Sequence, residues 1–266
     1  MNFCKFCLEN NSTLLTVKKR KWERVYSRCL SCGGVSMLPE FFLSEDEQKK
    51  RYQNHINIFQ NEGYLDFLCD FIFSVFSFIS DKEKCRNDFP KVSSLIDYGS
   101  GPNPAMIELL CAISSVIYNE KDIADYDFNL NKVFSRINSD FQNISNFIPS
   151  SDKIKGWDPF FNTASVLTDE SASLVFCLEV AEHFENPMES FKALANVCKK
   201  NGIVAAGTLP INSNMKFPED FENWWYKDDA THVSFYTEDA IKKCGSHAGL
   251  EYLGMASERI FMFRKN

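Results

Sequence analysis

The sequence lacks a hydrophobic run long enough to cross a membrane. The apolar run from Phe71 to Ile79 falls short of the roughly 20 residues that a spanning helix needs, and it follows Asp66 and Asp70. An apolar signal segment is also missing from the N-terminus. We therefore expect a cytoplasmic protein with no membrane span.

The sequence also lacks an excess of basic residues. It has 266 residues, with 29 Lys and Arg against 36 Asp and Glu, for a net charge of −7. The basic residues are concentrated near the N-terminus, so that residues 1–32 carry +5 and the remainder carries −12. An acidic main body argues against a broad nucleic-acid surface, whereas the basic N-terminal segment leaves a local one open.

Ten cysteines are present, and without an export signal we interpret them as thiols or metal ligands rather than disulfides. Four of them form two C-x-x-C pairs separated by 21 residues, Cys4 with Cys7 and Cys29 with Cys32. This spacing is typical of a tetrahedral zinc site with four thiolates. Four thiolates leave no open position, so we predict a structural zinc that stabilises a small ribbon over residues 1–38.

Residues 39–90 are predicted to form a helical linker or lid. Ser44 followed by Glu47 fits a capping box, so a helix is expected to begin there, and a second helix with apolar residues at helical spacing follows it. Tyr52 and His55 belong to the first of these helical segments. They fit either a solvated helix face or a lid over a neighbouring pocket.

The sequence next predicts a strand, a tight turn and a helix. An apolar run from Val92 to Ile96 leads into Asp97, and residues 105–114 have helical character. The turn between them consists of Gly99, Ser100 and Gly101. Glycines let a ligand approach the main chain and the free N–H groups of a helix start, so the turn fits a nucleoside-bearing cofactor as well as a plain connection. Pro104 replaces the third glycine of G-x-G-x-x-G, which disfavours a dehydrogenase.

Two acidic residues compete for the ribose of such a cofactor. In a doubly wound fold the strand after the first helix usually ends in a carboxylate that accepts from both ribose hydroxyls. Asp125 is nearer the usual spacing, whereas Asp158 lies in a better-defined motif but requires an insertion at about residues 119–151. Both residues remain candidates.

A buried strand, Ser173 to Leu178, leads into Glu179, Glu182 and His183. Continuous apolar strands are typical of parallel sheets, and ligands bind at the carboxyl ends of such strands. The three polar side chains therefore fit a binding site as well as a simple strand cap. A further strand–helix–strand unit follows, so residues 91–266 predict an α/β, Rossmann-like doubly wound sheet.

The segment 224–236 is rich in aromatic residues among polar neighbours. Trp225, Tyr226 and Tyr236 lie there with His232. We interpret the segment as a pocket wall rather than buried core.

Taken together, these motifs make the chain resemble the class I S-adenosylmethionine-dependent methyltransferases, and within them a bacterial group with a zinc-knuckle-like N-terminus. The resemblance covers nearly the whole chain apart from residues 119–151. It rests on five motifs in order, which are D-Y-G-S-G-P (97–102), W-D-P-F-F (157–161), E-V-A-E-H-F (179–184), K-K-N-G (199–202) and W-W-Y-K-D-D-A-T-H-V-S-F-Y (224–236).

The resemblance implies the following sites. Glu179 and His183 would face the sulfonium and the acceptor, and Asp125 stays a rival for the ribose. The other cofactor residues would be Asp97, Gly99, Ser100, Gly101 and Pro102 at the methionine end, Asp158 at the ribose, and Pro159 and Phe160 at the adenine. E-V-A-E-H is also similar to a motif of ubiquinone-pathway O-methyltransferases, which implies a divalent ion held by Glu179, Glu182 and His183.

The implied reaction is in-line methyl transfer, which needs mainly positioning, desolvation and a base. The candidate bases are His183, His232 and His55. The candidate substrate pocket comprises Tyr52, Glu182, Trp225, Tyr226 and Tyr236. The acidic body favours a small-molecule acceptor. The alternatives are an RNA or protein acceptor held by the basic ribbon, and a non-catalytic binding protein that retains the fold.

Overall fold

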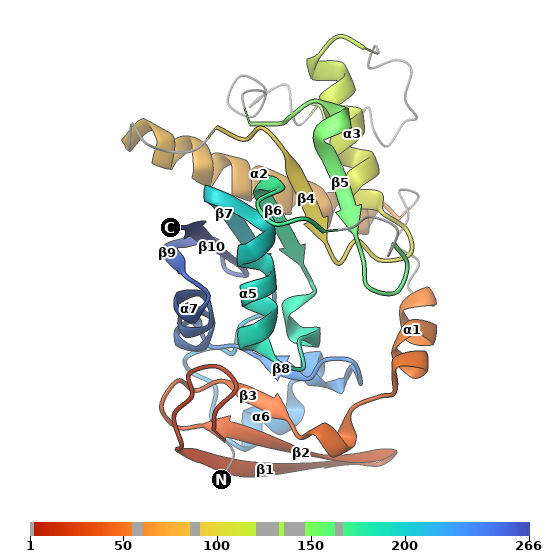
Figure 1. Ribbon diagram of the computed structural model, residues 1–266. Helices are drawn as coiled ribbons and strands as arrows, with labels where there is room; N and C mark the ends of the chain where they lie inside the picture. The colour runs from red at the N-terminus through yellow and green to blue at the C-terminus, as the bar shows by residue number, and fades with distance from the viewer. Residues whose placement is uncertain (1–2, 55–60, 86–90, 121–132, 136–146, 163–166) are drawn as a thin grey trace.

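A six-stranded sheet forms the centre of the structure, a computed structural model that describes residues 3–54, 61–85, 91–120, 133–135, 147–162 and 167–266 (Figure 1). The strands lie in the order β5-β4-β6-β7-β10-β9. Neighbours from β5 to β7 run parallel, and β10 pairs antiparallel with both β7 and β9. The strands are β4 (Leu95–Tyr98), β5 (Ile154–Trp157), β6 (Ala172–Leu178), β7 (Cys198–Gly207), β9 (Leu250–Ser257) and β10 (Ile260–Lys265). His55 and Asp125 lie outside the described residues.

Helices cover both faces of this sheet (Figure 1). On β6, Leu174 and Phe176 pack with α2 and α3, whereas Val175 and Cys177 pack with α5 and α7. Successive side chains of a strand point to opposite faces, so the unbroken apolar run of β6 requires a cover on each side. The prediction of a doubly wound α/β sheet is confirmed. The four helices are α2 (Glu62–Cys85), α3 (Ala105–Ile117), α5 (Pro187–Val197) and α7 (Glu238–His247).

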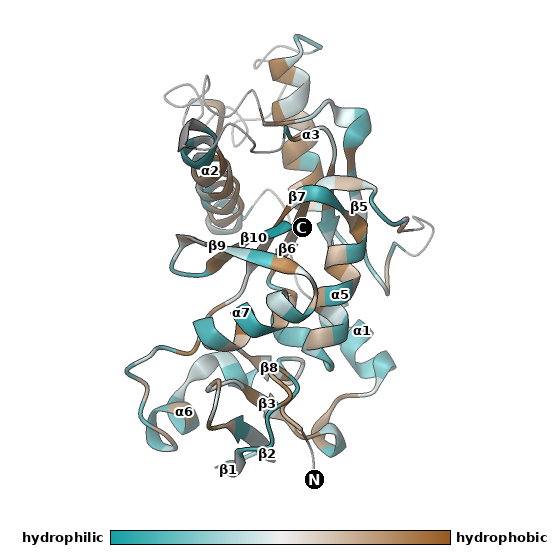
Figure 2. Cartoon of the chain, turned by 60° about the vertical axis from the view of Figure 1, so that its left-hand side comes forward, coloured by the Kyte–Doolittle hydropathy of each residue, from teal (hydrophilic) through white to brown (hydrophobic). Residues whose placement is uncertain are grey.

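Helix α2 is the longest described helix and packs on the sheet through apolar side chains (Figure 2). Within the described part of the chain it is the one helix long and apolar enough to cross a membrane by length and composition alone, over Glu62–Glu83. Half of that apolar window is buried inside the protein, and Ile72, Val75 and Phe76 are fully enclosed in the core. These are the properties of a core helix.

The N-terminal segment forms a second sheet in the order β1-β2-β3-β8. The first three strands belong to the predicted ribbon, but β8 comes from the C-terminal half and pairs with β3 through Val35 with Phe235 and Ser36 with Ser234. The bounds are β1 (Ser12–Lys19), β2 (Trp22–Cys29), β3 (Val35–Met37) and β8 (Ser234–Phe235). The ribbon is therefore joined to the main body by strand pairing.

Local sequence signals account for the helix starts. α1 (Glu45–Gln53) begins at the predicted capping box, in which the Ser44 N–H donates to the Glu47 carboxylate at 2.9 Å and the Glu47 N–H donates to Ser44 Oγ at 3.4 Å. The structure differs from the predicted turn at K-K-N-G (199–202). These residues belong to β7 (Cys198–Gly207), which begins at Cys198 and pairs there with β6. The pairing of β6 with β7 shifts register between Ala172 and Leu174, and Asn201 has a left-handed backbone with a φ of 63°.

Candidate functional site

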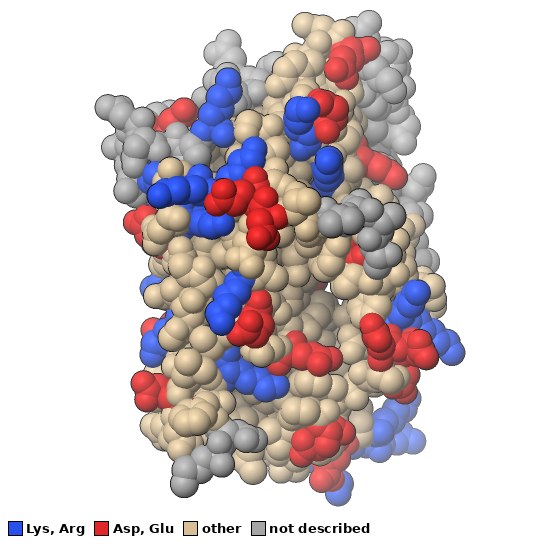
Figure 3. Space-filling model, in the orientation of Figure 1, with Lys and Arg blue, Asp and Glu red and all other residues tan. Residues whose placement is uncertain are grey.

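A cavity of about 620 Å³ lies at the carboxyl ends of β4, β5 and β6. The chain passes from β4 to β5 on one side and then returns to β6 on the other, and ligands bind at such switch points. Figure 3 shows the hollow on this face, between α1 and the body of the molecule. The predicted site residues that line the cavity are Tyr52, Asp97, Gly99, Ser100, Gly101, Pro102, Asp158, Pro159, Phe160, Glu179, Glu182, His183, Trp225, Tyr226 and His232. Their roles stay predictions.

The glycine turn after β4 shapes one wall of the cavity. Gly99 has a φ of 85°, and a Cβ there would lie 2.5 Å from a methyl group of Val180, so the close packing allows no side chain. Gly101 has a φ of 68°, but a Cβ there would meet no atom within 4 Å. Between them, Ser100 has a buried hydroxyl that makes no hydrogen bond among the described residues. The turn thus offers a ligand open space at Gly101.

Asp158 ties the end of β5 to this turn. One carboxylate oxygen accepts from the Gly101 N–H at 3.0 Å, and the other accepts from the N–H groups of Phe160 at 2.8 Å and Phe161 at 3.1 Å. Because β5 lies parallel to β4 in the sheet, Asp158 holds the strand-end position expected of a ribose-binding carboxylate. Burial, followed by the charge of Asp158, raises the pKa of Asp97 to about 7.

Glu179 stands at the end of β6 with an unusual backbone φ of 51°. Its carboxylate forms an ion pair with Arg259 at 2.7 Å and accepts a hydrogen bond from the Tyr226 hydroxyl at 3.3 Å. Burial raises its pKa to about 7. Arg259 lies between β9 and β10, so this ion pair joins the last hairpin to the cavity wall.

Glu182 is fully buried beside Glu179. Its Oε2 accepts from the Thr208 hydroxyl at 2.8 Å, but its Oε1 has no hydrogen-bond partner among the described residues. Burial raises the pKa of Glu182 to about 7.

His183 and His232 lie close together, with ring centroids 4.9 Å apart. The Nδ1 atom of His183 is 2.9 Å from the Thr231 carbonyl oxygen, and that of His232 is 2.7 Å from the Tyr226 carbonyl oxygen. Burial lowers the pKa of both rings, to about 3 for His232. Both imidazoles are therefore neutral at pH 7 and keep a lone pair on Nε2.

Helix α1 covers the cavity through Tyr52. The Tyr52 ring contacts Phe160 at 5.7 Å and His183 at 5.3 Å between ring centroids. Arg51, one residue earlier, makes two hydrogen bonds of 2.8 and 2.7 Å to the carboxylate of Asp229. Tyr52 therefore lies against the cavity, and the lid role of α1 stays a prediction.

The prediction that Tyr236 lines the substrate pocket is wrong. Tyr236 is fully buried, its hydroxyl donates to the Ala181 carbonyl oxygen at 2.8 Å, and its ring packs on Phe6 at 5.2 Å. Tyr236 is buried because it directly follows β8, and the ribbon covers it there through Phe6. Trp225, by contrast, lies at the rim of the cavity with 67% of its surface exposed.

Sequence reasoning missed four residues that support the site, namely Arg51, Thr208, Thr231 and Arg259. Thr208 directly follows β7, so the strand-end rule that identified Glu179 applies to it as well. Arg51 and Arg259 gave no local signal, because their acidic partners lie far away in the chain.

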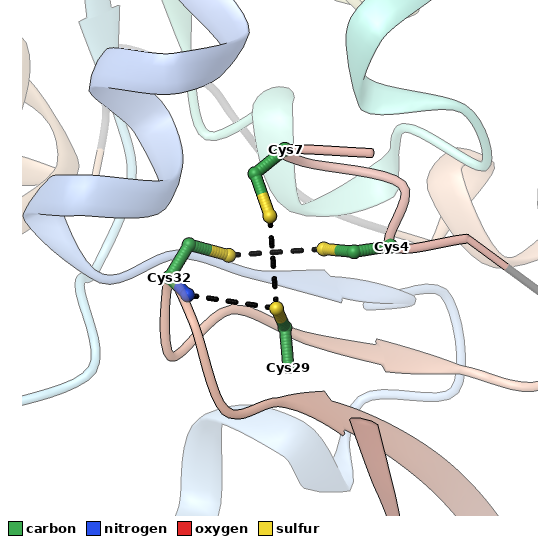
Figure 4. A group of neighbouring side chains, drawn as sticks. All are labelled: Cys4, Cys7, Cys29 and Cys32. Atoms are coloured by element: carbon green, nitrogen blue, oxygen red, sulfur yellow. Dashed lines mark hydrogen bonds between the residues drawn. The ribbon is translucent and has the colours of Figure 1, made fainter. Parts of the chain in front are cut away.

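The four predicted zinc ligands converge in space (Figure 4). The Sγ atoms of Cys4 and Cys32 are 3.7 Å apart, and those of Cys7 and Cys29 are 3.6 Å apart. All four side chains are buried. A hydrogen bond from Cys32 lowers the pKa of Cys4 to about 5, whereas burial raises that of Cys7 to about 11. Without a cation the four thiols therefore resist joint ionisation.

Comparison with known proteins gave these similarities. No curated protein matches the chain. Among solved structures, the chain is similar to an O-methyltransferase family protein from Burkholderia thailandensis, at 12% identity over 82% of this chain and 61% of that one, with a TM-score of 0.43. It is also similar to a SAM-dependent methyltransferase from Methanosarcina mazei, at 12% identity over 67% of this chain and 95% of that one, with a TM-score of 0.39. The chain spans about three fifths of the length of several such structures.

A family model described as a methyltransferase domain matches residues 64–254. The matched part begins in α2 and ends in β9, so it includes the glycine turn, Asp158, Glu179, Glu182 and both histidines of the cavity. The chain belongs to this family of methyltransferase domains.

Proposed function

We propose that the protein transfers a methyl group from S-adenosylmethionine to a small-molecule acceptor. The observation that carries this proposal is the open space over Gly101, which Asp97 and Asp158 flank in the same cavity. When bound, the cofactor supplies an activated methyl group on a sulfonium. The task of the protein is then to bind, orient and exclude water.

The residues of the cavity fit the parts of this cofactor. The buried Asp97 carboxylate suits the ammonium of the methionine end, because a cation there would stabilise its ionised form. Asp158 Oδ1 already accepts from two N–H groups, whereas Oδ2 accepts from the Gly101 N–H and keeps lone-pair capacity for a ribose hydroxyl. Phe160 and Tyr52 provide aromatic surface for the adenine side.

His183 is the better of the two described candidates for the base. Its Nε2 is free to take a proton, since its Nδ1 already donates to a backbone carbonyl. His232 has the same arrangement, but its pKa of about 3 makes it a weaker base. His55 keeps its status as a candidate outside the described residues.

The size of the cavity and the mixed surface charge favour a small molecule over RNA. Tyr52 and α1 narrow the entrance, which suits a compact acceptor. On the face shown in Figure 3, Lys and Arg alternate with Asp and Glu and form no broad basic patch.

We also propose a structural zinc at Cys4, Cys7, Cys29 and Cys32. The donor set of four buried sulfurs fits this ion, and zinc would balance the charge of the thiolates. In this proposal the ion fixes the fold and takes no part in methyl transfer.

The test is a calorimetric titration of the zinc-loaded protein with S-adenosylmethionine and, separately, with S-adenosylhomocysteine. We expect both to bind, and we expect Asp158→Ala to weaken binding by at least tenfold because the ribose loses its acceptor. No binding of either compound would reject the proposal and favour a non-catalytic binding protein.

A further inference from the structure

Three side chains beside the glycine turn point toward one another: Glu182, His183 and His232. One ligand atom from each of them lies within 4.8 Å of the ligand atoms of the other two. Ligands on one side of an ion, at about 2.0–2.2 Å from it, lie about 3.0–3.5 Å apart. Small side-chain rotations are therefore enough to bring all three onto one ion.

The two imidazoles are already oriented for metal binding. A carbonyl oxygen only accepts hydrogen bonds, so the carbonyls of Thr231 and Tyr226 place the proton of each ring on Nδ1. The lone pair of each ring is consequently on Nε2. Metal-binding histidines are typically fixed by this kind of backbone contact on the opposite nitrogen.

The third side chain has a buried oxygen without a partner. Glu182 is 0% exposed, and its Oε1 makes no hydrogen bond among the described residues; His183 Nε2 lies 3.9 Å from it. An unpaired oxygen in such a place costs free energy. The neighbouring carboxylates are balanced, Glu179 by Arg259 and Asp229 by Arg51. A cation at Glu182 would supply the missing partner.

We propose that Glu182, His183 and His232 bind a divalent first-row transition ion. Two imidazoles and one carboxylate on one side of an ion form a ligand set suited to Fe²⁺ or Zn²⁺, whereas Mg²⁺ and Ca²⁺ prefer oxygen ligands throughout. This ligand set differs from the one that E-V-A-E-H implied. Glu179 is held by Arg259 and Tyr226, and His232 from the loop before β8 takes its place.

The open positions of the ion face the cavity, since all three ligands line it. The role of the ion rests on the proposed function. With the ion bound, His183 and His232 act as its ligands and no longer as bases. An acceptor hydroxyl bound to the ion would have a lowered pKa and lose its proton to solvent. The acceptor oxygen then bonds to the methyl carbon, the carbon–sulfur bond breaks, and its electron pair stays on sulfur. The acceptor class is therefore a hydroxyl compound with a second oxygen that can chelate.

The test is a titration with Co²⁺ of protein that holds one equivalent of Zn²⁺, the amount that the four thiolates take up, followed by visible absorption. Zinc in the cysteine cluster keeps that site filled, and a thiolate-to-cobalt charge-transfer band would reveal any exchange there. We expect one Co²⁺ to bind with d–d bands and without the thiolate band. Glu182→Gln and His232→Gln should each weaken binding by on the order of 100-fold, since changes in outer-shell partners alone cost 10–100-fold.

The matched control is His247→Gln, because His247 is an exposed histidine at the end of α7, away from the cavity. It should bind Co²⁺ like the wild type. Glu182→Gln is nearly isosteric and keeps an acceptor for Thr208, so its metal-free unfolding free energy should equal or exceed that of the wild type. A purely structural Glu182 would instead make this variant less stable. Histidine-independent Co²⁺ binding, or none, would overturn the proposal.

Acetohydroxamate, a bidentate oxygen ligand, tests the open positions. It should change the cobalt spectrum of the wild type, and an unchanged spectrum would show that the positions are closed to an acceptor. Calorimetry with S-adenosylmethionine, performed without Co²⁺, keeps the two proposals separate. Cofactor binding without a cobalt site rejects only the metal site, and a cobalt site without cofactor binding rejects only the methyl-transfer function.

Discussion

Gly101 and Gly249 provide a matched pair for testing the cofactor cavity. Both have a positive φ, 68° and 76°, and at both a Cβ would meet no atom within 4 Å. Gly101 lines the cavity, whereas Gly249 lies in the exposed turn between α7 and β9. Alanine at either position therefore carries the same backbone penalty and no steric clash, but only one of the two enters the space assigned to the cofactor.

The left-handed conformation costs a non-glycine residue about 1–2 kcal/mol. We expect Gly101→Ala and Gly249→Ala to lower the free energy of unfolding by this amount, or about 2–4 °C in Tm for each kcal/mol in a protein of this size. Gly101→Ala should also weaken S-adenosylmethionine binding by at least tenfold, which is about 1.4 kcal/mol, because the methyl group takes up the open space. Calorimetry and thermal unfolding on both variants measure these effects.

The control decides the interpretation. Gly249→Ala should retain the affinity of the wild type at the same loss of stability. Normal binding by Gly101→Ala would show that no ligand approaches this part of the turn, and equal weakening in both variants would show that the loss follows stability rather than contact. Either result refutes the cofactor placement.

Three further predictions concern the support of the site. Asp97 has a pKa of about 7 in the folded protein against 3.8 as its ordinary value, so the folded protein should lose stability as the pH rises from about 4 to about 7. The loss of stability is at most about 4 kcal/mol. Asp97→Asn should therefore be more stable than the wild type above pH 7 in denaturant titrations, and this advantage should shrink toward pH 4. A difference in stability that does not change with pH would contradict a buried charge at Asp97. Arg51→Met should cost less than about 1 kcal/mol of stability, because the pair with Asp229 is partly exposed. Arg51→Met should nevertheless raise the Kd of the cofactor several-fold, because α1 loses its contact with Asp229. Lys50→Met, on an exposed part of α1, should leave the Kd unchanged. The same Kd in both variants would argue against a lid. Removal of zinc by a strong chelator should lower Tm by several degrees, and Cys29→Ser should unfold at the Tm of the metal-free wild type; an unchanged Tm after metal removal would exclude a structural ion.

The sequence was most informative where the physical cause is local. Ser44 and Glu47 are three residues apart, so their capping box is readable directly, and the apolar run of β6 requires cover on both faces. Between Asp125 and Asp158 the sequence could not decide, because the position of a strand end depends on long-range pairing. The pairing of β5 with β4 places Asp158 beside the glycine turn, and Asp125 lies outside the described residues. The Glu179–Arg259 ion pair and the approach of His232 to Glu182 depend on the completed sheet, and no spacing rule connects these residues.

The error at Tyr236 has the same origin. Aromatic residues with polar neighbours suggest a pocket wall, but burial of Tyr236 depends on Phe6 and the ribbon, more than 200 residues earlier in the chain. A pattern within one segment carries no information about a distant segment that covers it.

Because β3 pairs with β8, the ribbon supports the segment of chain that carries His232. His232 lies two residues before β8, and the hydroxyl of Thr237, two residues after it, donates to the Cys32 carbonyl oxygen at 2.5 Å. Zinc bound to the cysteines would then also stabilise the position of His232, because an ion that binds the folded chain stabilises the folded arrangement. Deletion of the ribbon would expose the edge of β8. A role of the ribbon in substrate binding is therefore better tested by reversing surface charges such as those of Lys18 and Lys19.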